Sequence, residues 1–244
     1  MRICYATYID NQAVIGYPIK FLLSEIPELK IFCSDETERK ELQRELGVVN
    51  ITPIGVKIKA PADIATAQNK CLDMLLSNFD FVVWIQADIF LTEEAKRIIK
   101  EVCLERNLHG AFSLKTRHLR LFHVAGTTYF GVSIIGRNCE GRFVGDGSHI
   151  QGAVSLGSDD CTIDIGYLSI PQYKRHLRQH AKTWQSDNHN YEWSDELFVK
   201  DILAPHTGNG LNGLIQQGSY YWTLVEKLGM IDDYNYVKQL IGTK

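Results

Sequence analysis

The stretch that decides the fold is FDFVVWIQADIF, residues 79–90. Its apolar run, residues 81–85, is typical of a strand that is buried on both faces of a sheet. The strand should end where its polar residues begin, which places Asp88 at the carboxyl end. Because open α/β sheets bind ligands at that edge, we expect the Asp88 carboxylate to lie in a ligand site.

The composition is that of an ordinary globular protein, with 244 residues, of which 45% are hydrophobic and 23% charged. A net charge of −3 disfavours a broad nucleic-acid-binding face. The six cysteines are scattered and predict reduced, buried thiols rather than a zinc site or a disulfide framework. We find no apolar run of the ~18 residues that a membrane helix needs, and no signal peptide, so we expect the cytoplasm.

Strands and helices are predicted to alternate up to residue 106. The helix at 92–106 has the clearest pattern, with apolar residues at helical spacing from Ala95 to Cys103 and Thr92 as its N-cap. The remaining elements are predicted strands at 2–8, 28–34, 48–56 and 79–86, and helices at 13–26, 35–46 and 63–76. This alternation predicts a largely parallel sheet covered by helices on both faces.

The pattern changes after residue 110, where glycines and short β-like runs predict antiparallel strands at 111–114, 127–135 and 151–156. Helices are predicted again at 172–184, 195–203, 220–228 and 234–241. We therefore expect an α/β fold with a Rossmann-like, mostly parallel sheet and added antiparallel strands over residues 1–184. Residues 185–244 would form a C-terminal helical appendage for acceptor or oligomer contacts, and its aromatic residues allow a homodimer.

Three consecutive features resemble family 2 glycosyltransferases, which have the GT-A fold. They are the helix segment Ala67-Gln68-Asn69-Lys70, the strand at 81–85 and the motif Gln86-Ala87-Asp88, which resembles that of a bacterial and phage-type subset. Ile89 stands where that subset usually has Glu. Residues 133–138 and 163–167 resemble two later segments, and the resemblance covers roughly residues 1–184.

The resemblance implies a nucleotide-sugar donor and a divalent metal, Mn²⁺ or Mg²⁺. Such a cation stabilises the charge that develops on the departing diphosphate, and it needs few protein ligands because phosphates and waters complete its octahedron. We predict Asp88 and Asp164 as the metal ligands. Asp164 takes the position of a family His that is a metal ligand. The alternatives are that Asp88 caps the following helix and that Asp164 lies in a turn.

Donor-binding residues are predicted at the ends of the strands and on two helices. The candidates are Thr7, Asp10, Asp35, Asn69, Gln86, Asp88, His176 and His180. Asp35 is equally well placed as a helix N-cap, and Asn69 as a polar group on a helix face. His176 and His180 share one face of a basic helix, which would clamp the diphosphate or simply face solvent.

An inverting transfer needs a base that accepts the proton of the acceptor hydroxyl. Asp146, within Gly145-Asp146-Gly147, is the first candidate, and a plain turn is the alternative. Asp195 is the second candidate, and a helix start is its alternative.

These observations predict a metal-dependent glycosyltransferase that moves a sugar from a nucleotide sugar, most simply a UDP-sugar, to an acceptor hydroxyl. The acceptor would be a saccharide, a lipid or another hydroxyl compound. Three alternatives stay open: a nucleotidyltransferase that makes nucleotide sugars, a non-catalytic nucleotide-sugar-binding module, and a transferase that acts on modified DNA bases. Residues 8–12 hold no Gly-rich phosphate loop, which disfavours the nucleotidyltransferase.

Overall fold

The central strand of the sheet is β4 (Phe81–Ile85), and all five of its residues are buried. Phe81, Val83 and Ile85 pack into one hydrophobic cluster, whereas Val82 and Trp84 pack into another on the opposite face. The apolar run therefore forms the doubly buried strand that the sequence predicts. The computed structural model describes residues 1–9, 16–47, 50–184, 194–207 and 213–242.

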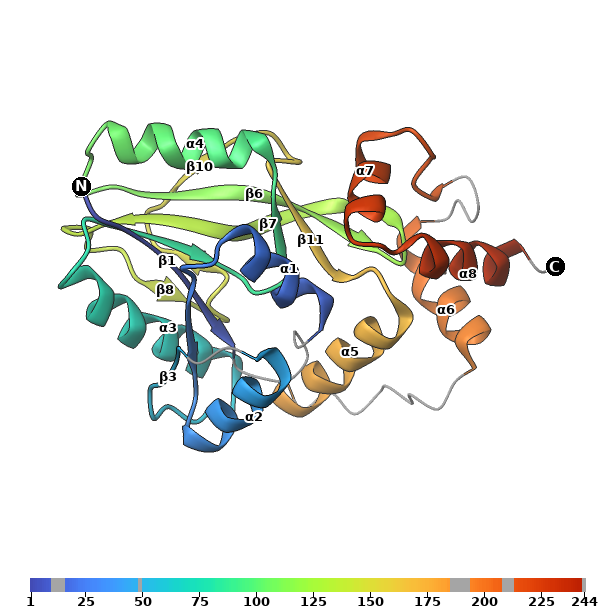
Figure 1. The fold of residues 1–244 in the computed structure, drawn as a ribbon, viewed down its shortest axis with the longest axis horizontal. Helices are drawn as coiled ribbons and strands as arrows, with labels where there is room; N and C mark the ends of the chain where they lie inside the picture. The colour runs from blue at the N-terminus through green and yellow to red at the C-terminus, as the bar shows by residue number, and fades with distance from the viewer. Residues whose placement is uncertain (10–15, 48–49, 185–193, 208–212, 243–244) are drawn as a thin grey trace.

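The N-terminal part supplies the parallel strands. β4 pairs in parallel with β1 (Ile3–Ile9), β1 with β2 (Lys30–Cys33), and β2 with β3 (Ile51–Pro53). The helices of this part flank the sheet, with α3 and α4 on opposite faces (Figure 1); they are α1 (Tyr17–Glu25), α2 (Glu36–Leu46), α3 (Pro61–Leu76) and α4 (Glu93–Leu104). The α/β alternation predicted for this region is confirmed.

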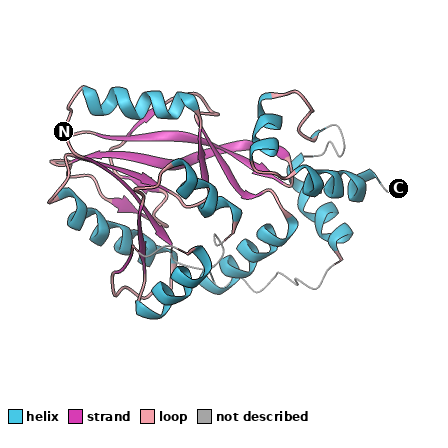
Figure 2. Cartoon of the chain, viewed as in Figure 1, coloured by secondary structure: helices cyan, strands magenta, loops and turns pink. Residues whose placement is uncertain are grey.

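The middle of the chain adds antiparallel strands on the other side of β4 (Figure 2). β7 (His123–Gly136) runs antiparallel to both β4 and β6 (Ala111–Arg120), and β11 (Thr162–Tyr167) lies parallel to β6. The strand order is β3-β2-β1-β4-β7-β6-β11-β5, with β5 (Ile89–Leu91) at the edge. β10 (Val154–Leu156) pairs in parallel with β6, so the antiparallel strand predicted at 151–156 is wrong in its direction. The remaining strands form the ribbon of β8 (Phe143–Val144) and β9 (His149–Ile150). The predicted fold class is confirmed.

Two of the alternative interpretations are wrong. Asp164 does not lie in a turn, because it belongs to β11. Asp88 does not cap the helix that follows, because the Thr92 side chain accepts the hydrogen bond from Ala95 N and is the N-cap of α4. β6 also extends beyond the strand predicted at 111–114 and includes the basic segment at 115–120.

Three C-terminal helices, α6 (Asp195–Thr207), α7 (Tyr220–Lys227) and α8 (Ile231–Gly242), gather at one end of the sheet (Figure 1) and pack onto it. The helix that precedes them in the chain is α5 (Ile170–Trp184). Phe198, Trp222 and Tyr234 share a hydrophobic cluster with Phe122 and Ile163 of the sheet region. The predicted appendage is therefore present as helices, and it buries the end of the sheet.

The turn between β6 and β7 has an unusual backbone. Leu121 and Phe122 adopt φ values of 45° and 63°, a region that β-carbon-bearing residues rarely occupy. Both side chains are fully buried in the cluster shared with the C-terminal helices, and Phe122 O accepts a hydrogen bond from Ile215 N. Burial of two large apolar side chains offsets the backbone strain.

The six cysteines are all buried and free, as the sequence predicts. Burial raises the pKa of most of them, for example that of Cys33 to about 12, so these thiols are poor nucleophiles at neutral pH. Across the described ranges, no helix combines the length and apolar character that spanning a membrane requires.

Candidate functional site

Asp88 and Asp164 come together at the carboxyl end of β4. Asp88 follows β4 and directly precedes β5, which pairs with β11 so that Ile89 lies opposite Asp164. The N–H of Ile165 donates to the Asp88 carbonyl at 2.9 Å, which joins the two segments. Both side chains are buried, with exposed fractions of 8% for Asp88 and 1% for Asp164. Two residues that are 76 positions apart in the sequence thus place their carboxylates close together.

Because Gly166 has no side chain, the side chains of Asp88 and His176 can occupy the space beside it. A Cβ atom at position 166 would lie 2.6 Å from Asp88 Oδ2 and 3.0 Å from Nε2 of His176. Such separations are too short for real side chains, so any larger residue would displace the carboxylate or the imidazole. No local sequence pattern singles out Gly166, because its role depends on contacts with distant residues.

Asp164 is held by three neighbouring groups. Gly166 N donates to Oδ1 at 2.8 Å, and the Tyr129 hydroxyl donates to Oδ2 at 3.4 Å. Nδ1 of His118 lies 2.7 Å from the same Oδ2, and its ring stacks on Tyr129 with centroids 4.4 Å apart. These contacts fix the orientation of the Asp164 carboxylate.

His176 lies beside Asp88. It sits on α5, which begins shortly after β11, and its Nε2 is 3.7 Å from Asp88 Oδ2. Its ring is 4.6 Å from that of Tyr167, and the side chain is buried. The structure therefore brings the predicted His176 to the two carboxylates, whereas the side chain of His180 lies outside the described residues.

The two carboxylates act on the same phenols. Burial raises the pKa of Tyr129 and of Tyr167 well above the ordinary value, and the charges of Asp164 and Asp88 raise both further. Burial and the same two charges also raise the pKa of Tyr17, whose hydroxyl donates to Ile165 O. All three phenols therefore stay protonated at neutral pH and provide hydrogen-bond donors around a region of concentrated negative charge.

This donor set suits a hard divalent cation in part. Asp88 and Asp164 supply carboxylate oxygens, the ligands that Mn²⁺ and Mg²⁺ prefer. Within the described ranges, no group of three His, Cys, Asp or Glu side chains has the arrangement of a complete metal site. A cation held here would take its other ligands from substrate phosphates and water.

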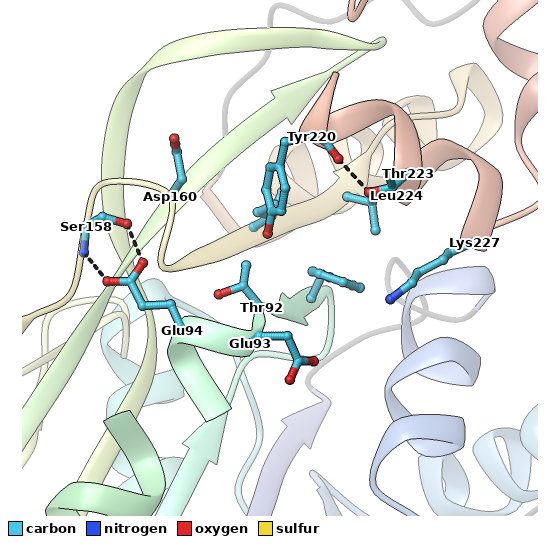
Figure 3. A pocket seen from close by; sticks show the side chains of 11 residues that line it. Thr92, Glu93, Glu94, Ser158, Asp160, Tyr220, Thr223, Leu224 and Lys227 are labelled. Carbon is cyan, nitrogen blue, oxygen red and sulfur yellow. Dashed lines mark hydrogen bonds between the residues drawn. The ribbon is translucent and has the colours of Figure 1, made fainter. Parts of the chain in front are cut away.

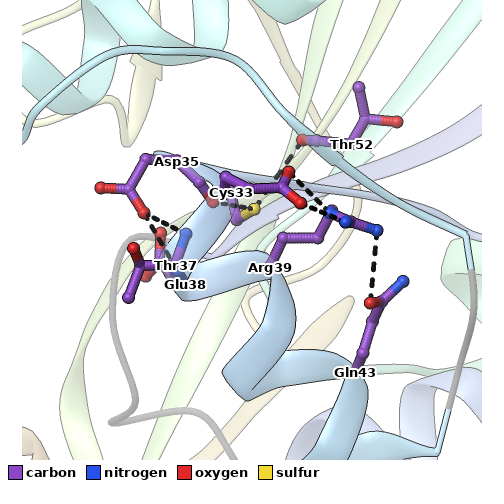
Figure 4. Close-up of polar contacts among 8 residues, drawn as sticks. Cys33, Asp35, Thr37, Glu38, Arg39, Gln43 and Thr52 are labelled. Atoms are coloured by element: carbon purple, nitrogen blue, oxygen red, sulfur yellow. Dashed lines mark hydrogen bonds and ion pairs between the residues drawn. The ribbon is translucent and has the colours of Figure 1, made fainter.

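Asp35 is the N-cap of α2, which is one of the two roles that the sequence predicts for it; the other is binding of the donor. Its Oδ1 accepts hydrogen bonds from the N–H groups of Thr37, at 2.9 Å, and Glu38, at 3.0 Å (Figure 4). The Asp35 carbonyl also accepts from the thiol of Cys33. Because Oδ1 accepts both hydrogen bonds from the helix end, contact between Asp35 and a nucleobase of the donor would use Oδ2.

The remaining donor candidates occupy different environments. Asn69 Nδ2 donates to Phe143 O at 2.9 Å and its Oδ1 accepts from Phe143 N at 2.8 Å, so the amide ties α3 to β8. Gln86 is half-buried directly after β4, next to the carboxylates in the chain. Thr7 is fully buried in β1, and its Oγ1 makes no hydrogen bond with any residue that the structure describes. Asp10 lies outside the described residues.

The two candidate bases differ in their partners. Asp146 lies in the predicted turn, between Gly145 at φ 63° and Gly147 at φ 79°, and its Oδ1 accepts from Ser148 N and Oγ. Asp195 begins α6, and Lys174 Nζ donates to its carboxylate at 2.7 Å. The bond from Lys174 holds the pKa of Asp195 below its ordinary value, so Asp195 is a poor proton acceptor at neutral pH.

The basic segment of β6 is engaged in ion pairs. Lys115 Nζ lies 3.1 Å from Asp159, and Arg117 Nε lies 2.7 Å from Asp160. Its neighbour His118 instead faces Asp164. Alternation along the strand predicts that His118 lies on the face opposite to Lys115 and Arg117, but it does not predict Asp164 as the partner, which depends on the pairing of β6 with β11.

Comparisons with known proteins give no match to a family model and none to a curated protein sequence. Among solved structures, a cytidylyltransferase from Leptospira borgpetersenii matches with a TM-score of 0.42 and 11% identity, over 90% of this chain and 100% of that chain. A glucose-1-phosphate thymidylyltransferase from Bacillus anthracis matches with a TM-score of 0.36 and 16% identity, over 55% of this chain and 72% of that chain.

A third solved structure, named as a mannose-1-phosphate geranyltransferase from Thermus thermophilus, has a TM-score of 0.38 and 8% identity, over 56% of this chain. The match spans 58% of the length of that chain. The first two names describe nucleotidyl transfer. At these TM-scores the similarity assigns neither a family nor an activity to this chain.

Proposed function

We propose that this protein is a metal-dependent glycosyltransferase that uses a nucleotide-sugar donor. The observation that supports the proposal is the burial of Asp88 and Asp164 together at the carboxyl end of a central strand. Sheets of this kind bind nucleotides at that edge. Two carboxylates that lie close together repel each other when both are charged, and a divalent cation on a diphosphate would offset that repulsion.

The residues around the carboxylates would each have a defined task. Asp88 and Asp164 would hold Mn²⁺ or Mg²⁺, which when bound stabilises negative charge on the leaving diphosphate. Tyr129 and the Gly166 N–H orient Asp164, and His176 lies where it would contact the metal or a phosphate oxygen. Tyr17 fastens the start of α1 to the Ile165 carbonyl beside the site.

Asp146 is the preferred base for the acceptor hydroxyl. Its rival Asp195 is held in an ion pair with Lys174, and a carboxylate with a lowered pKa is a poor proton acceptor at neutral pH. Among the described residues, Asp146 accepts hydrogen bonds from Ser148 alone, and its glycine-flanked turn permits close approach of a ligand. Direct displacement by the activated hydroxyl would invert the anomeric carbon.

Nucleotidyl transfer is the second candidate. It is the activity in the names of two matched solved structures, and it would use the same metal at the same edge of the sheet. The segment after β1, Tyr8-Ile9-Asp10-Asn11-Gln12, lacks the Gly-rich loop with Arg and Lys expected of that class. Ile89, in place of a second acidic residue, is buried in the core, so Asp88 and Asp164 would have to suffice in either reaction.

Product analysis separates the two candidates. The protein is incubated with Mn²⁺ and a panel of UDP-sugars, and separately with nucleoside triphosphates and sugar 1-phosphates. Release of UDP that is lost in Asp88→Asn supports glycosyl transfer, and release of pyrophosphate supports nucleotidyl transfer. If neither product forms but UDP binds, the chain is a nucleotide-sugar-binding module and the proposed activity is wrong.

A further inference from the structure

A cavity lies between the start of α4, the loop at residues 157–161 and α7 (Figure 3). Its volume is about 300 Å³. That is at the lower end of the ~300–1,000 Å³ range of small-molecule sites. Ile163 lines the cavity, and Ile163 and Asp164 are successive residues of β11. Their side chains point to opposite faces of the sheet, so the cavity is separate from the Asp88–Asp164 centre.

The acidic side chains of this cavity, Glu93, Glu94 and Asp160, already have partners, and Oε1 of Glu93 lies 3.0 Å from Nζ of Lys96. The Glu94 carboxylate accepts from Ser158 N at 2.9 Å and from Ser158 Oγ at 2.6 Å. Asp160 accepts from Arg117 Nε at 2.7 Å. No three potential metal ligands cluster anywhere in the described part of the chain. The lining therefore does not select a metal ion or a strongly cationic ligand.

Hydrogen-bonding capacity and apolar surface remain on the lining. Each carboxylate oxygen has two lone pairs, so Glu94 and Asp160 can accept further bonds from hydroxyl groups. Tyr220 has an exposed fraction of 54%, and its hydroxyl end points toward Thr92 (Figure 3). Burial and the charge of Asp160 raise the pKa of the Tyr220 hydroxyl, so the phenol stays neutral.

We propose that this cavity binds a neutral saccharide, with one face of a sugar ring against Tyr220 and hydroxyls donating to Glu94 and Asp160. A sugar ring combines an apolar C–H face with a rim of hydroxyl groups, and this lining offers a partner to each. Lys227 Nζ, which lies 5.6 Å from the centre of the Phe90 ring, is a donor for sugar oxygens. The site does not depend on the proposed transferase activity.

The test measures binding of maltose, cellobiose, lactose and chitobiose by saturation-transfer NMR and titration, without metal or nucleotide. At least one sugar should bind the wild type, and Tyr220→Ala should weaken that binding about tenfold or more, because the stacking face is lost. Tyr220→Phe keeps the ring and should retain binding. Tyr236→Ala is the matched control, since Tyr236 is a 45% exposed tyrosine on α8 and does not line the cavity.

Two results would overturn the proposal. One is that none of the four sugars binds the folded wild type at millimolar concentration. The other is that binding survives in Tyr220→Ala, which would place it elsewhere on the protein. The assay contains no nucleotide and no metal, so its outcome does not depend on whether the protein is a transferase.

Discussion

The absence of a side chain at Gly166 shapes the candidate centre. Gly166→Ala would push a methyl group against Asp88 Oδ2 and His176 Nε2. We expect this substitution to weaken Mn²⁺-dependent nucleotide binding about tenfold or more. A site with few protein ligands depends on the exact position of each ligand, and the methyl group would displace Asp88. Isothermal titration of UDP with Mn²⁺ measures this effect.

Gly141→Ala is the matched control for that change. A Cβ atom there would lie 2.6 Å from Gln151 O, near β8 and β9, so it strains the fold without touching the carboxylates. It should lower the melting temperature but leave metal-linked binding of the remaining folded protein unchanged. Equal loss of binding in both variants would show that Gly166 acts through stability alone.

Asp195 provides a prediction on pH. Its folded-state pKa is lowered from 3.8, chiefly by the bond from Lys174, so the pair stabilises the protein above pH 3.8 and loses this effect as pH falls through the folded value. The side chain is partly exposed, so Asp195→Asn should cost only about 0.5–1 kcal/mol at neutral pH. Urea unfolding at pH 7 and near pH 3 checks this. A difference that grows in acid would contradict it.

Among the secondary-structure elements, the β6–β7 turn combines a strained backbone with fully buried side chains. Phe122→Ala removes a buried ring and should cost about 3–5 kcal/mol. Phe122→Gly loses the same ring but relieves the positive φ, so it should be about 1 kcal/mol more stable than the alanine variant. Chemical unfolding of the two variants gives the order, and greater stability of Phe122→Ala would refute the strained turn.

Elements with strong local signals could be predicted from the sequence. The apolar run at 81–85 and the periodic helix after Thr92 depend on near neighbours, and both lie within a few residues of the predicted bounds. β5 has three residues, too few for a local pattern to detect. The six residues of β11 begin with the polar-apolar alternation Thr-Ile-Asp-Ile, but its pairing with β5 and β6 is set by segments far away in the sequence.

The candidate centre could be predicted only in part. Asp88 follows from the strand-end rule, and Asp164 came from the family resemblance rather than from its own surroundings. His118 and Tyr129 reach Asp164 through the register of β6, β7 and β11, which no local pattern specifies. Long-range strand pairing is therefore the information that local sequence patterns lack.

At the scale of the whole molecule, the helical appendage covers the end of the sheet. The ring of Tyr234 lies 5.5 Å from that of Phe122, and Trp222 lies in the same cluster. A fragment of residues 1–184 would expose this apolar surface, so it should be insoluble or unfold without a cooperative transition. A fragment with a sharp thermal transition would support the predicted boundary at 184 as that of an independent domain.

The central claim is that Asp88 and Asp164 hold one divalent cation on a nucleoside diphosphate. The most direct measurement is calorimetric titration of UDP into wild type, Asp88→Asn and Asp164→Asn, each with and without Mn²⁺. We expect Mn²⁺ to strengthen UDP binding to the wild type, and each substitution to remove that gain while leaving the melting temperature of the metal-free protein close to that of the wild type. Mn²⁺-independent binding, or an undiminished Mn²⁺ effect in both variants, would contradict the claim.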